Sequence, residues 1–267
     1  MISDVHFHTF FSPDSKEDPR KYIEKAISLG MPYLCFTDHC DIDYYDENEG
    51  SFFLDKFSYF NTLYPLRDEY KKDIHVLIGV EQGLEVSKAD KINNFLDNED
   101  FDYIIGSSHM VNGVDPYYPS FFDGRTVNSA LNEYFDSVIE NINTFDNFDV
   151  YGHIDYVARY ISDSSYEYSY EQFKEKIDYI LKLLIEKGKG IEINTGGYRS
   201  KLNAPNPCVD IVKSYNKLGG KIITVGSDAH KIDDFSSDFD KIPNILSQCN
   251  FDYYNVFSKR KPVKIPL

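Results

Sequence analysis

Short apolar runs recur along the chain and predict the strands of a mostly parallel sheet. The runs are rich in Ile, Val, Phe and Tyr, and most of them lack a clean alternation of apolar and polar positions. This composition is typical of strands that are buried on both faces. The predicted strands are Asp4–His8, Tyr33–Asp38, His75–Glu81, Tyr103–Ser108, Phe148–His153, Gly190–Asn194 and Lys221–Gly226.

Amphipathic stretches between these runs predict helices. The predicted helices are Pro19–Leu29, Lys56–Tyr70, Thr126–Phe145, Tyr170–Lys187 and Cys208–Leu218. The first begins after Asp18, a good N-terminal cap, and stops at Gly30, a residue that suits the position after a helix end. Ser169 is placed to cap the helix that follows it, whereas Pro65 predicts an interruption of the helix in which it lies.

Strands and helices therefore alternate along the 267 residues, with no linker, low-complexity tract or break in composition. We expect a single domain over residues 1–267 with an α/β barrel fold, and a doubly wound sheet is the alternative. The distinction matters for function, because a barrel places its active site at the carboxyl ends of its strands.

Histidines gather at those predicted strand ends. Of the seven histidines in the chain, only His75 opens a predicted strand. Residues two apart on a strand point to the same side, so His6 and His8 face a common site. The other candidate ligands lie at or beyond the strand ends, with Asp14 in the loop after the first strand: Asp14, His39, Glu81, His109, His153, Asp228 and His230.

These imidazole and carboxylate groups predict a metal centre. Both are ligands of zinc, iron and manganese, and nine candidate ligands are too many for one ion. We expect two or three divalent ions, with a carboxylate such as Glu81 bridging two of them. A purely structural site would instead use a closed set of Cys and His ligands.

Charge and composition narrow the expected partners. The formal net charge of −16 disfavours binding to nucleic acid backbones. The four cysteines show no paired spacing, which predicts reduced thiols. The sequence shows neither a signal peptide nor an apolar stretch of membrane-spanning length. We therefore expect a cytoplasmic protein that binds neither nucleic acid nor membrane.

The motifs around the candidate ligands resemble those of the polymerase and histidinol phosphatase (PHP) family. They occur in the family's order over nearly the whole chain: His6–Phe7–His8, Thr37–Asp38–His39, Gly79–Val80–Glu81, Ser108–His109, Gly152–His153 and Gly226–Ser227–Asp228–Ala229–His230. The resemblance implies a distorted seven-stranded (β/α) barrel with up to three metals. It also implies three ligand sets: His6, His8, Glu81 and Asp228; Glu81, His109 and His153; and Asp14, His39 and His230.

Two further runs resemble the branch of this family that hydrolyses L-histidinol phosphate. They are Gly152–Tyr160 and Glu192–Thr195, and the second is followed by Arg199. The resemblance implies that Arg159 and Arg199 hold the phosphate, a role that suits a planar guanidinium. For the remaining arginines, we expect surface charges at Arg20, Arg67 and Arg260, and Arg125 is left open.

The implied reaction is the metal-dependent hydrolysis of a phosphate monoester. Metal-activated water would attack phosphorus, the two arginines would neutralise the phosphoryl oxygens, and Asp228 or His230 would protonate the leaving alkoxide. Six loop residues are candidates for recognising the ammonium and imidazole of histidinol, although most of them also fit an ordinary polar loop: Asp43, Tyr44, Tyr45, Asp46, Tyr117 and Tyr118.

Other activities stand as alternatives. A related phosphotyrosine phosphatase or exonuclease would share the metal ligands, but the acidic chain has no basic run that could line a nucleic-acid groove. A metal-dependent amidohydrolase also uses a His-x-His pattern, but it usually bridges its metals with a lysine, and no lysine ends a predicted strand. The last alternative is a non-catalytic metal-binding protein.

Overall fold

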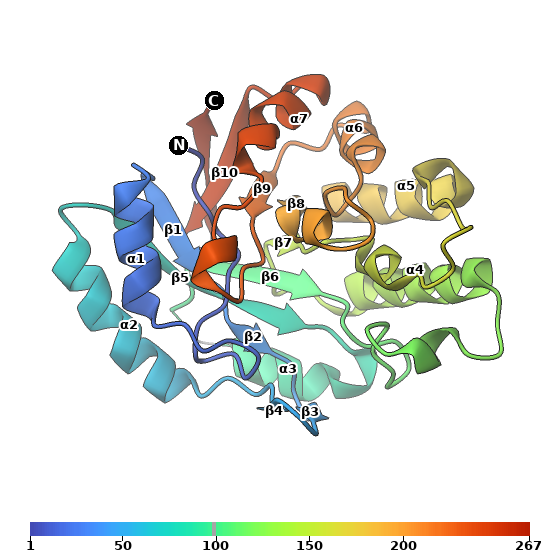
Figure 1. Ribbon diagram of the computed structural model, residues 1–267, viewed down its shortest axis with the longest axis horizontal. Helices are drawn as coiled ribbons and strands as arrows, with labels where there is room; N and C mark the ends of the chain where they lie inside the picture. The colour runs from blue at the N-terminus through green and yellow to red at the C-terminus, as the bar shows by residue number, and fades with distance from the viewer. Residues whose placement is uncertain (98–99) are drawn as a thin grey trace.

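The computed structural model describes residues 1–97 and 100–267 and is built around a curled parallel sheet (Figure 1). The strands lie in the order β1 (Tyr33–Phe36), β5 (His75–Gly83), β6 (Tyr103–Ser107), β7 (Val150–Tyr151), β8 (Gly190–Asn194) and β9 (Ile223–Gly226). The short strand β2 (His39–Cys40) also pairs with β5 and places His39 beside Glu81. All parallel strands end on the same side of the sheet, so their carboxyl ends form one rim.

An irregular N-terminal segment joins the two edges of this sheet. Asp4 forms a parallel bridge with Leu34 of β1, and Phe7 forms one with Ala229 just after β9. The predicted strand Asp4–His8 is therefore wrong as a regular strand, because its hydrogen bonds alternate between two neighbours and form no ladder with either. The segment nevertheless closes the sheet, and the predicted distorted barrel is confirmed.

Most predicted strands keep their positions with altered bounds. Tyr33–Asp38 ends earlier, as β1, and the chain pairs again only at β2. The predicted strand Phe148–His153 is reduced to β7, and Lys221–Gly226 to β9. Outside the sheet, β3 (Tyr45–Asp46) and β4 (Gly50–Ser51) form a hairpin that the apolar pattern does not predict.

The predicted helices are present, and the described residues form two further short α-helices, α3 and α7. The helices are α1 (Pro19–Ser28), α2 (Lys56–Tyr70), α3 (Ala89–Leu96), α4 (Val127–Thr144), α5 (Tyr170–Glu186), α6 (Val209–Lys217) and α7 (Ile242–Gln248). Asp18 caps α1 through the main-chain nitrogen of Arg20, and Ser169 forms a capping box with Gln172. The predicted interruption at Pro65 is wrong, because α2 continues through this residue.

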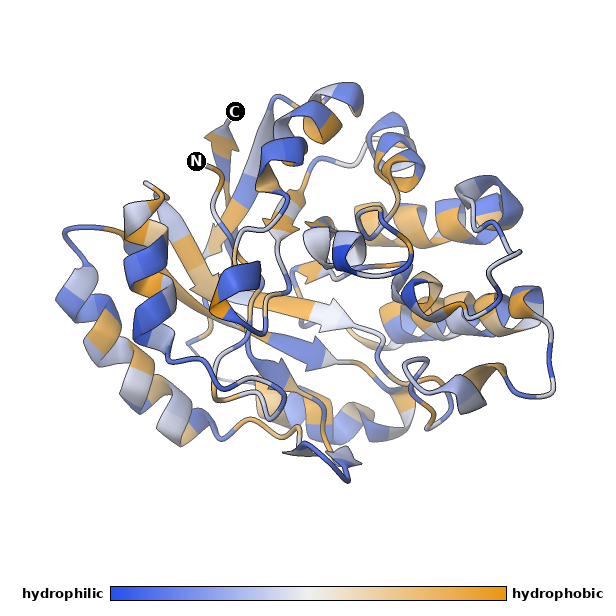
Figure 2. Cartoon of the chain, in the orientation of Figure 1, coloured by the Kyte–Doolittle hydropathy of each residue, from blue (hydrophilic) through white to orange (hydrophobic). Residues whose placement is uncertain are grey.

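Apolar side chains of the strands and helices form a buried cluster. Figure 2 colours the chain by hydropathy and shows apolar stretches along strands of the sheet and alternating apolar and polar positions along the helices. Phe135 and Val138 of α4 and Ile177 and Leu181 of α5 are buried in this cluster. The four cysteines are free thiols. Within the described residues, none of the helices combines the length and the apolar composition that crossing a membrane requires.

A C-terminal hairpin covers the end of the barrel opposite the rim. It consists of β10 (Tyr253–Ser258) and β11 (Lys261–Pro266). The Arg260 guanidinium donates to Asp149 Oδ2 over 2.6 Å and to Asn147 Oδ1 over 2.9 Å, just before β7 begins. The expectation of a solvated Arg260 is therefore wrong, because the side chain ties the hairpin to the barrel. Arg20 and Arg67 keep exposed side chains.

Candidate active site

The Glu81 carboxylate lies at the centre of the rim, near the carboxyl end of β5. Both of its oxygens are buried, and five imidazoles have a ring nitrogen within 3.6 Å of one of them: His6, His8, His39, His109 and His153. The shortest contacts are 2.8 Å from Oε1 to His153 Nε2 and 2.9 Å from Oε2 to His39 Nδ1. One carboxylate thus joins groups from four separate segments of the barrel.

A second cluster lies beside Glu81 and is more open. Asp14 Oδ2 is 3.0 Å from His230 Nε2 and 3.6 Å from His39 Nε2. The two imidazole nitrogens are themselves 3.4 Å apart. The ring of His8 stacks on both, with centroid distances of 4.0 Å to His39 and 4.1 Å to His230. Asp14, in the loop that follows the N-terminal segment, therefore reaches the rim.

Asp228 connects the clusters from the other side. Its Oδ1 lies 3.4 Å from His8 Nε2 and 3.9 Å from His6 Nε2, and its Oδ2 accepts a hydrogen bond from Arg159. Its backbone has a φ of 56°, in the left-handed region that residues other than glycine rarely occupy. Such strained residues concentrate at functional sites, where the surrounding structure holds them in place.

The donor set of these clusters fits divalent cations. Several of its nitrogen and oxygen atoms are buried without a hydrogen bond of suitable geometry: His6 Nε2, His8 Nε2, Asp14 Oδ1, His39 Nδ1 and Glu81 Oε2. Buried polar groups rarely lack partners, because desolvation without compensation is costly. The ligand atoms of His6, His8 and Glu81 lie within 4.8 Å of one another, as do those of Glu81, His109 and His153. Metal ions bound by these ligand sets would give the buried nitrogen and oxygen atoms the partners that they lack.

The electrostatics of the site keep its central carboxylate ionised. Burial favours the neutral form of Glu81, but the surrounding His6, His109 and His39 hold its pKa well below the usual value. Burial, together with His39 and His230, lowers the pKa of His8 well below its usual value. His8 is therefore a neutral imidazole with a lone pair, which is the form that binds metals.

Outer partners fix the orientation of the imidazoles, and sequence reasoning missed them. His6 Nδ1 donates to Glu192 Oε1 over 2.6 Å, and His109 Nδ1 donates to Asp41 Oδ1 over 3.0 Å. Carboxylates in this position are a regular feature of metal-binding histidines. Asp41 lies two residues after His39, and this strand spacing is the signal that could have identified it.

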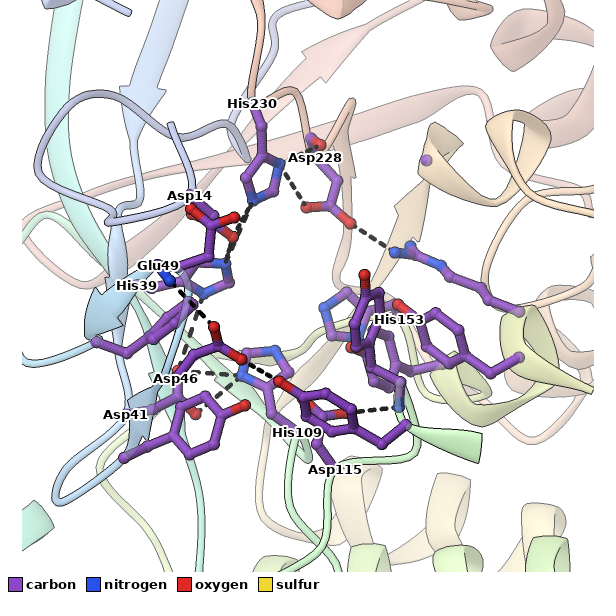
Figure 3. A pocket seen from close by; sticks show the side chains of 18 of the residues that line it. Asp14, His39, Asp41, Asp46, Glu49, His109, Asp115, His153, Asp228 and His230 are labelled. Carbon is purple, nitrogen blue, oxygen red and sulfur yellow. Dashed lines mark hydrogen bonds and ion pairs between the residues drawn. The ribbon is translucent and has the colours of Figure 1, made fainter. Parts of the chain in front are cut away.

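The rim opens into a cavity of about 560 Å³, which Figure 3 shows from close by. Arg159 from the turn Tyr156–Tyr160 and Arg199 from the turn Thr195–Arg199 line it on the side of Asp228. The Arg199 guanidinium donates to the main-chain oxygens of Ser227 and Asp228. The two arginines predicted to act together therefore meet at one wall. Arg125 lies outside this lining and pairs with Glu133.

Another wall of the cavity is acidic and aromatic. Asp46 of the β3–β4 hairpin and Tyr44 just before it line this wall together with Tyr117 and Tyr118, and the Tyr118 hydroxyl donates to Asp46. Two of the six candidate recognition residues lie elsewhere: Asp43 pairs with Lys91, and Tyr45 is 69% exposed. The cavity lining thus combines two arginines with several carboxylates and tyrosine rings.

A closed barrel with a histidine and carboxylate cluster at its rim defines a metal-dependent hydrolase of the barrel type. The PHP domain pattern matches residues 4–196, and the chain belongs to this family. It is 34% identical over 228 residues to the histidinol-phosphatase of Lactococcus lactis, covering 85% of this chain and 83% of that protein. It is 24% identical over 257 residues to the histidinol-phosphatase of Bacillus subtilis, covering 86% of this chain and 94% of that protein.

Solved structures show the same likeness. The crystal structure of histidinol phosphate phosphatase from L. lactis, complexed with zinc, L-histidinol and phosphate, matches with a TM-score of 0.91 and 31% identity. The match covers 98% of this chain and 99% of that one. A Listeria monocytogenes structure with a TM-score of 0.77, 20% identity and 90% coverage of this chain, and 99% of its own, shares the fold.

Proposed function

We propose that this protein hydrolyses L-histidinol phosphate to L-histidinol and inorganic phosphate. The observation that carries the proposal is the placement of two arginines beside the histidine and carboxylate cluster in one cavity. A phosphate monoester needs both a charged anion-binding wall and a centre that activates water. The similarity to histidinol-phosphatases over most of the chain supports the choice of substrate.

The cluster would hold two or three divalent ions of zinc, iron or manganese. The proposed ligand sets are His6, His8, Glu81 and Asp228; Glu81, His109 and His153; and Asp14, His39 and His230. The contacts of Glu81 with members of all three sets support a bridging role. When bound, such ions supply a nucleophilic water at neutral pH and neutralise phosphoryl charge.

The remaining steps belong to the side chains. Arg159 and Arg199 bind the phosphoryl oxygens and orient phosphorus towards the cluster. Asp228 and His230 both line the cavity, and one of them transfers a proton to the leaving oxygen. The buried floor around Glu81 excludes bulk water from the reacting centre.

The acidic wall favours an alcohol that carries positive charge. Asp46, Glu49 and Asp115 line the cavity alongside Tyr44 and Tyr118. The ammonium of histidinol would be attracted to these carboxylates, and its imidazole would pack against the aromatic rings. Free L-histidinol should therefore inhibit the enzyme more strongly than a neutral alcohol of similar size, and equal inhibition would contradict this part of the proposal.

The decisive experiment measures inorganic phosphate release by metal-loaded protein. L-histidinol phosphate, phosphotyrosine and a simple sugar phosphate are compared at equal enzyme concentration. We expect kcat/KM for L-histidinol phosphate to exceed the others by orders of magnitude and to be abolished by a chelator. A preference for phosphotyrosine, or feeble and equal hydrolysis of all three, would refute the proposed substrate.

A further inference from the structure

Three side chains from separate parts of the chain hold the Arg159 guanidinium. Nε donates to Asn206 Oδ1 over 2.7 Å, Nη2 donates to Asn194 Oδ1 over 2.8 Å, and Nη1 donates to Asp228 Oδ2 over 2.8 Å. The arginine side chain is only 10% exposed. Each guanidinium nitrogen thus has a protein partner, and further N–H groups remain for a ligand in the cavity.

The two asparagines are paired with each other through the main chain. Asn194 ends β8, and its nitrogen donates to the Asn206 carbonyl over 2.7 Å, while the Asn206 nitrogen donates back over 2.9 Å. This isolated bridge places both side-chain amides against the same guanidinium. The pair therefore forms a bracket, by which we mean Asn194 and Asn206 together.

Two glycines leave the space that the bracket requires. A Cβ on Gly196 would lie 2.8 Å from Asn194 Oδ1 and 3.2 Å from Arg159 Nη2. A Cβ on Gly197 would lie 2.5 Å from Asn206 Oδ1. Any larger residue at either position would push against the amide oxygens that face Arg159.

The chemistry of an amide explains why asparagine occupies both positions. Asn194 Nδ2 donates to Glu192 Oε2 over 3.1 Å, and Asn206 Nδ2 donates to Asp155 Oδ1 over 2.6 Å. Each side chain thus accepts from a cation at one end and donates to a buried carboxylate at the other. The amide oxygens orient Arg159 without cancelling its charge, whereas an aspartate would neutralise it and repel the neighbouring carboxylate.

We propose that Asn194 and Asn206 are positioning residues that hold the Arg159 guanidinium in its phosphate-binding orientation. This inference rests on the phosphate role of Arg159 in the proposed function. Without the bracket, the guanidinium keeps only Asp228 as a side-chain partner, and its orientation towards the cavity is no longer fixed. Loss of either asparagine should then weaken phosphate binding while leaving the metal content unchanged.

A double-mutant cycle tests the inference through direct binding. Inorganic phosphate is titrated calorimetrically into metal-loaded wild-type protein, Asn194→Ala, Asn206→Ala, Arg159→Ala and the two double variants. Each asparagine variant should weaken phosphate binding about tenfold, the effect of one hydrogen bond to a charged group. In the Arg159→Ala background the same substitutions should have no further effect, because the interaction they support is gone.

Asn147→Ala is the matched control. Asn147 Oδ1 accepts from Arg260 Nη1 over 2.9 Å at the opposite end of the barrel, so its loss removes the same type of contact away from the cavity. Phosphate affinity should stay at the wild-type value in this variant. A parallel measurement of bound metal and of the thermal midpoint separates a loosened bracket from an unfolded site.

The inference is overturned if the asparagine substitutions weaken phosphate binding equally with and without Arg159, or if the wild-type protein binds no phosphate. Should Asn206→Ala not fold, Asn194→Ala carries the same cycle. Turnover of L-histidinol phosphate is measured separately. Failure of that turnover with an intact binding cycle rejects the proposed substrate and still supports the bracket, so the two failures are distinguishable.

Discussion

Arg159 Nη1 lies 2.8 Å from Asp228 Oδ2, so the residue proposed to bind phosphate is ion-paired with one proposed to bind metal. Both side chains are almost fully buried. Burial opposes the charge of Arg159, but Asp228 beside it raises the arginine pKa above its usual value. The guanidinium therefore remains charged at the wall of the cavity, where the proposed substrate would bring its phosphoryl group between Arg159 and the proposed metal ligands.

Removing the arginines should affect phosphate binding more than folding. Arg159→Ala and Arg199→Ala should each weaken inhibition by inorganic phosphate roughly tenfold or more, because a charge-assisted hydrogen bond is lost. Arg125→Ala serves as the control, since its partner Glu133 lies outside the cavity. Equal phosphate inhibition in all three variants, measured by steady-state kinetics, would contradict the assignment.

Glu81→Gln should remove the common partner of the histidines. The amide cannot supply two anionic oxygens to the five surrounding imidazoles, so we expect loss of bound metal and a fall in activity beyond the roughly 10–100-fold typical of outer partners. Metal content by elemental analysis after dialysis checks this directly. The exposed Glu140 on α4 offers a matched control, because Glu140→Gln should retain both metal and activity.

Glu192→Gln tests the orientation of His6. The carboxylate accepts from His6 Nδ1 and also from the His153 main-chain nitrogen and Asn194 Nδ2. A glutamine would present an NH2 group to some of these donors, and we expect metal affinity to fall about 10–100-fold with the fold retained. Competition with a chelator of known affinity gives the measurement. Unchanged affinity would show that His6 needs no such partner.

Chelation should destabilise the protein as well as inactivate it. The buried cluster around Glu81 and His8 leaves polar atoms without hydrogen bonds when no cation is bound. An ion held at 1,000 times its Kd contributes about 4 kcal/mol of stability, which corresponds to a shift of order 10 °C in the thermal midpoint. Calorimetry before and after chelation, and after zinc is restored, provides the check. An unshifted midpoint in protein shown to be metal-free would contradict a metal-stabilised rim.

Arg260→Ala should destabilise the barrel at the end opposite the active site. Loss of the ion pair leaves Asp149 buried without its partner, and we expect a cost of about 2 kcal/mol, below that of a fully buried pair because Arg260 is partly exposed. Burial already raises the pKa of Asp149, and Arg260 opposes that shift. Chemical denaturation of the wild type and the variant gives the difference in unfolding free energy.

The pH dependence of this difference has a definite sign. Because the folded-state pKa of Asp149 lies above its unfolded value, its ionisation disfavours the folded state as pH rises, and losing Arg260 enlarges that penalty. The deficit of Arg260→Ala should therefore be largest at neutral pH and shrink as acid protonates Asp149. A deficit that grows on acidification would contradict the ion-pair explanation. Catalytic constants near neutral pH should match the wild type.

The apolar pattern located most of the barrel because each strand is buried on both faces. Strands β5, β6, β8 and β9 fall where continuous apolar runs predict them. The helix ends follow local capping chemistry, as at Asp18 and Ser169. The apolar pattern wrongly predicted a regular strand at Asp4–His8. This segment forms bridges with both edges of the sheet, and those partners lie far away in the sequence, so the local pattern does not reveal them.

By itself, the sequence determined the strand and helix repeat, the chemical types of the candidate ligands and their places at strand ends, because local periodicity and parallel topology fix these. Only the tertiary structure decided which outer groups hold them: Glu192 against His6, Asp41 against His109, and the bracket against Arg159. It also decided that the C-terminal hairpin covers the opposite end through Arg260. These contacts join residues that are mostly far apart in sequence, and burial and hydrogen-bond geometry select them only when the chain is closed.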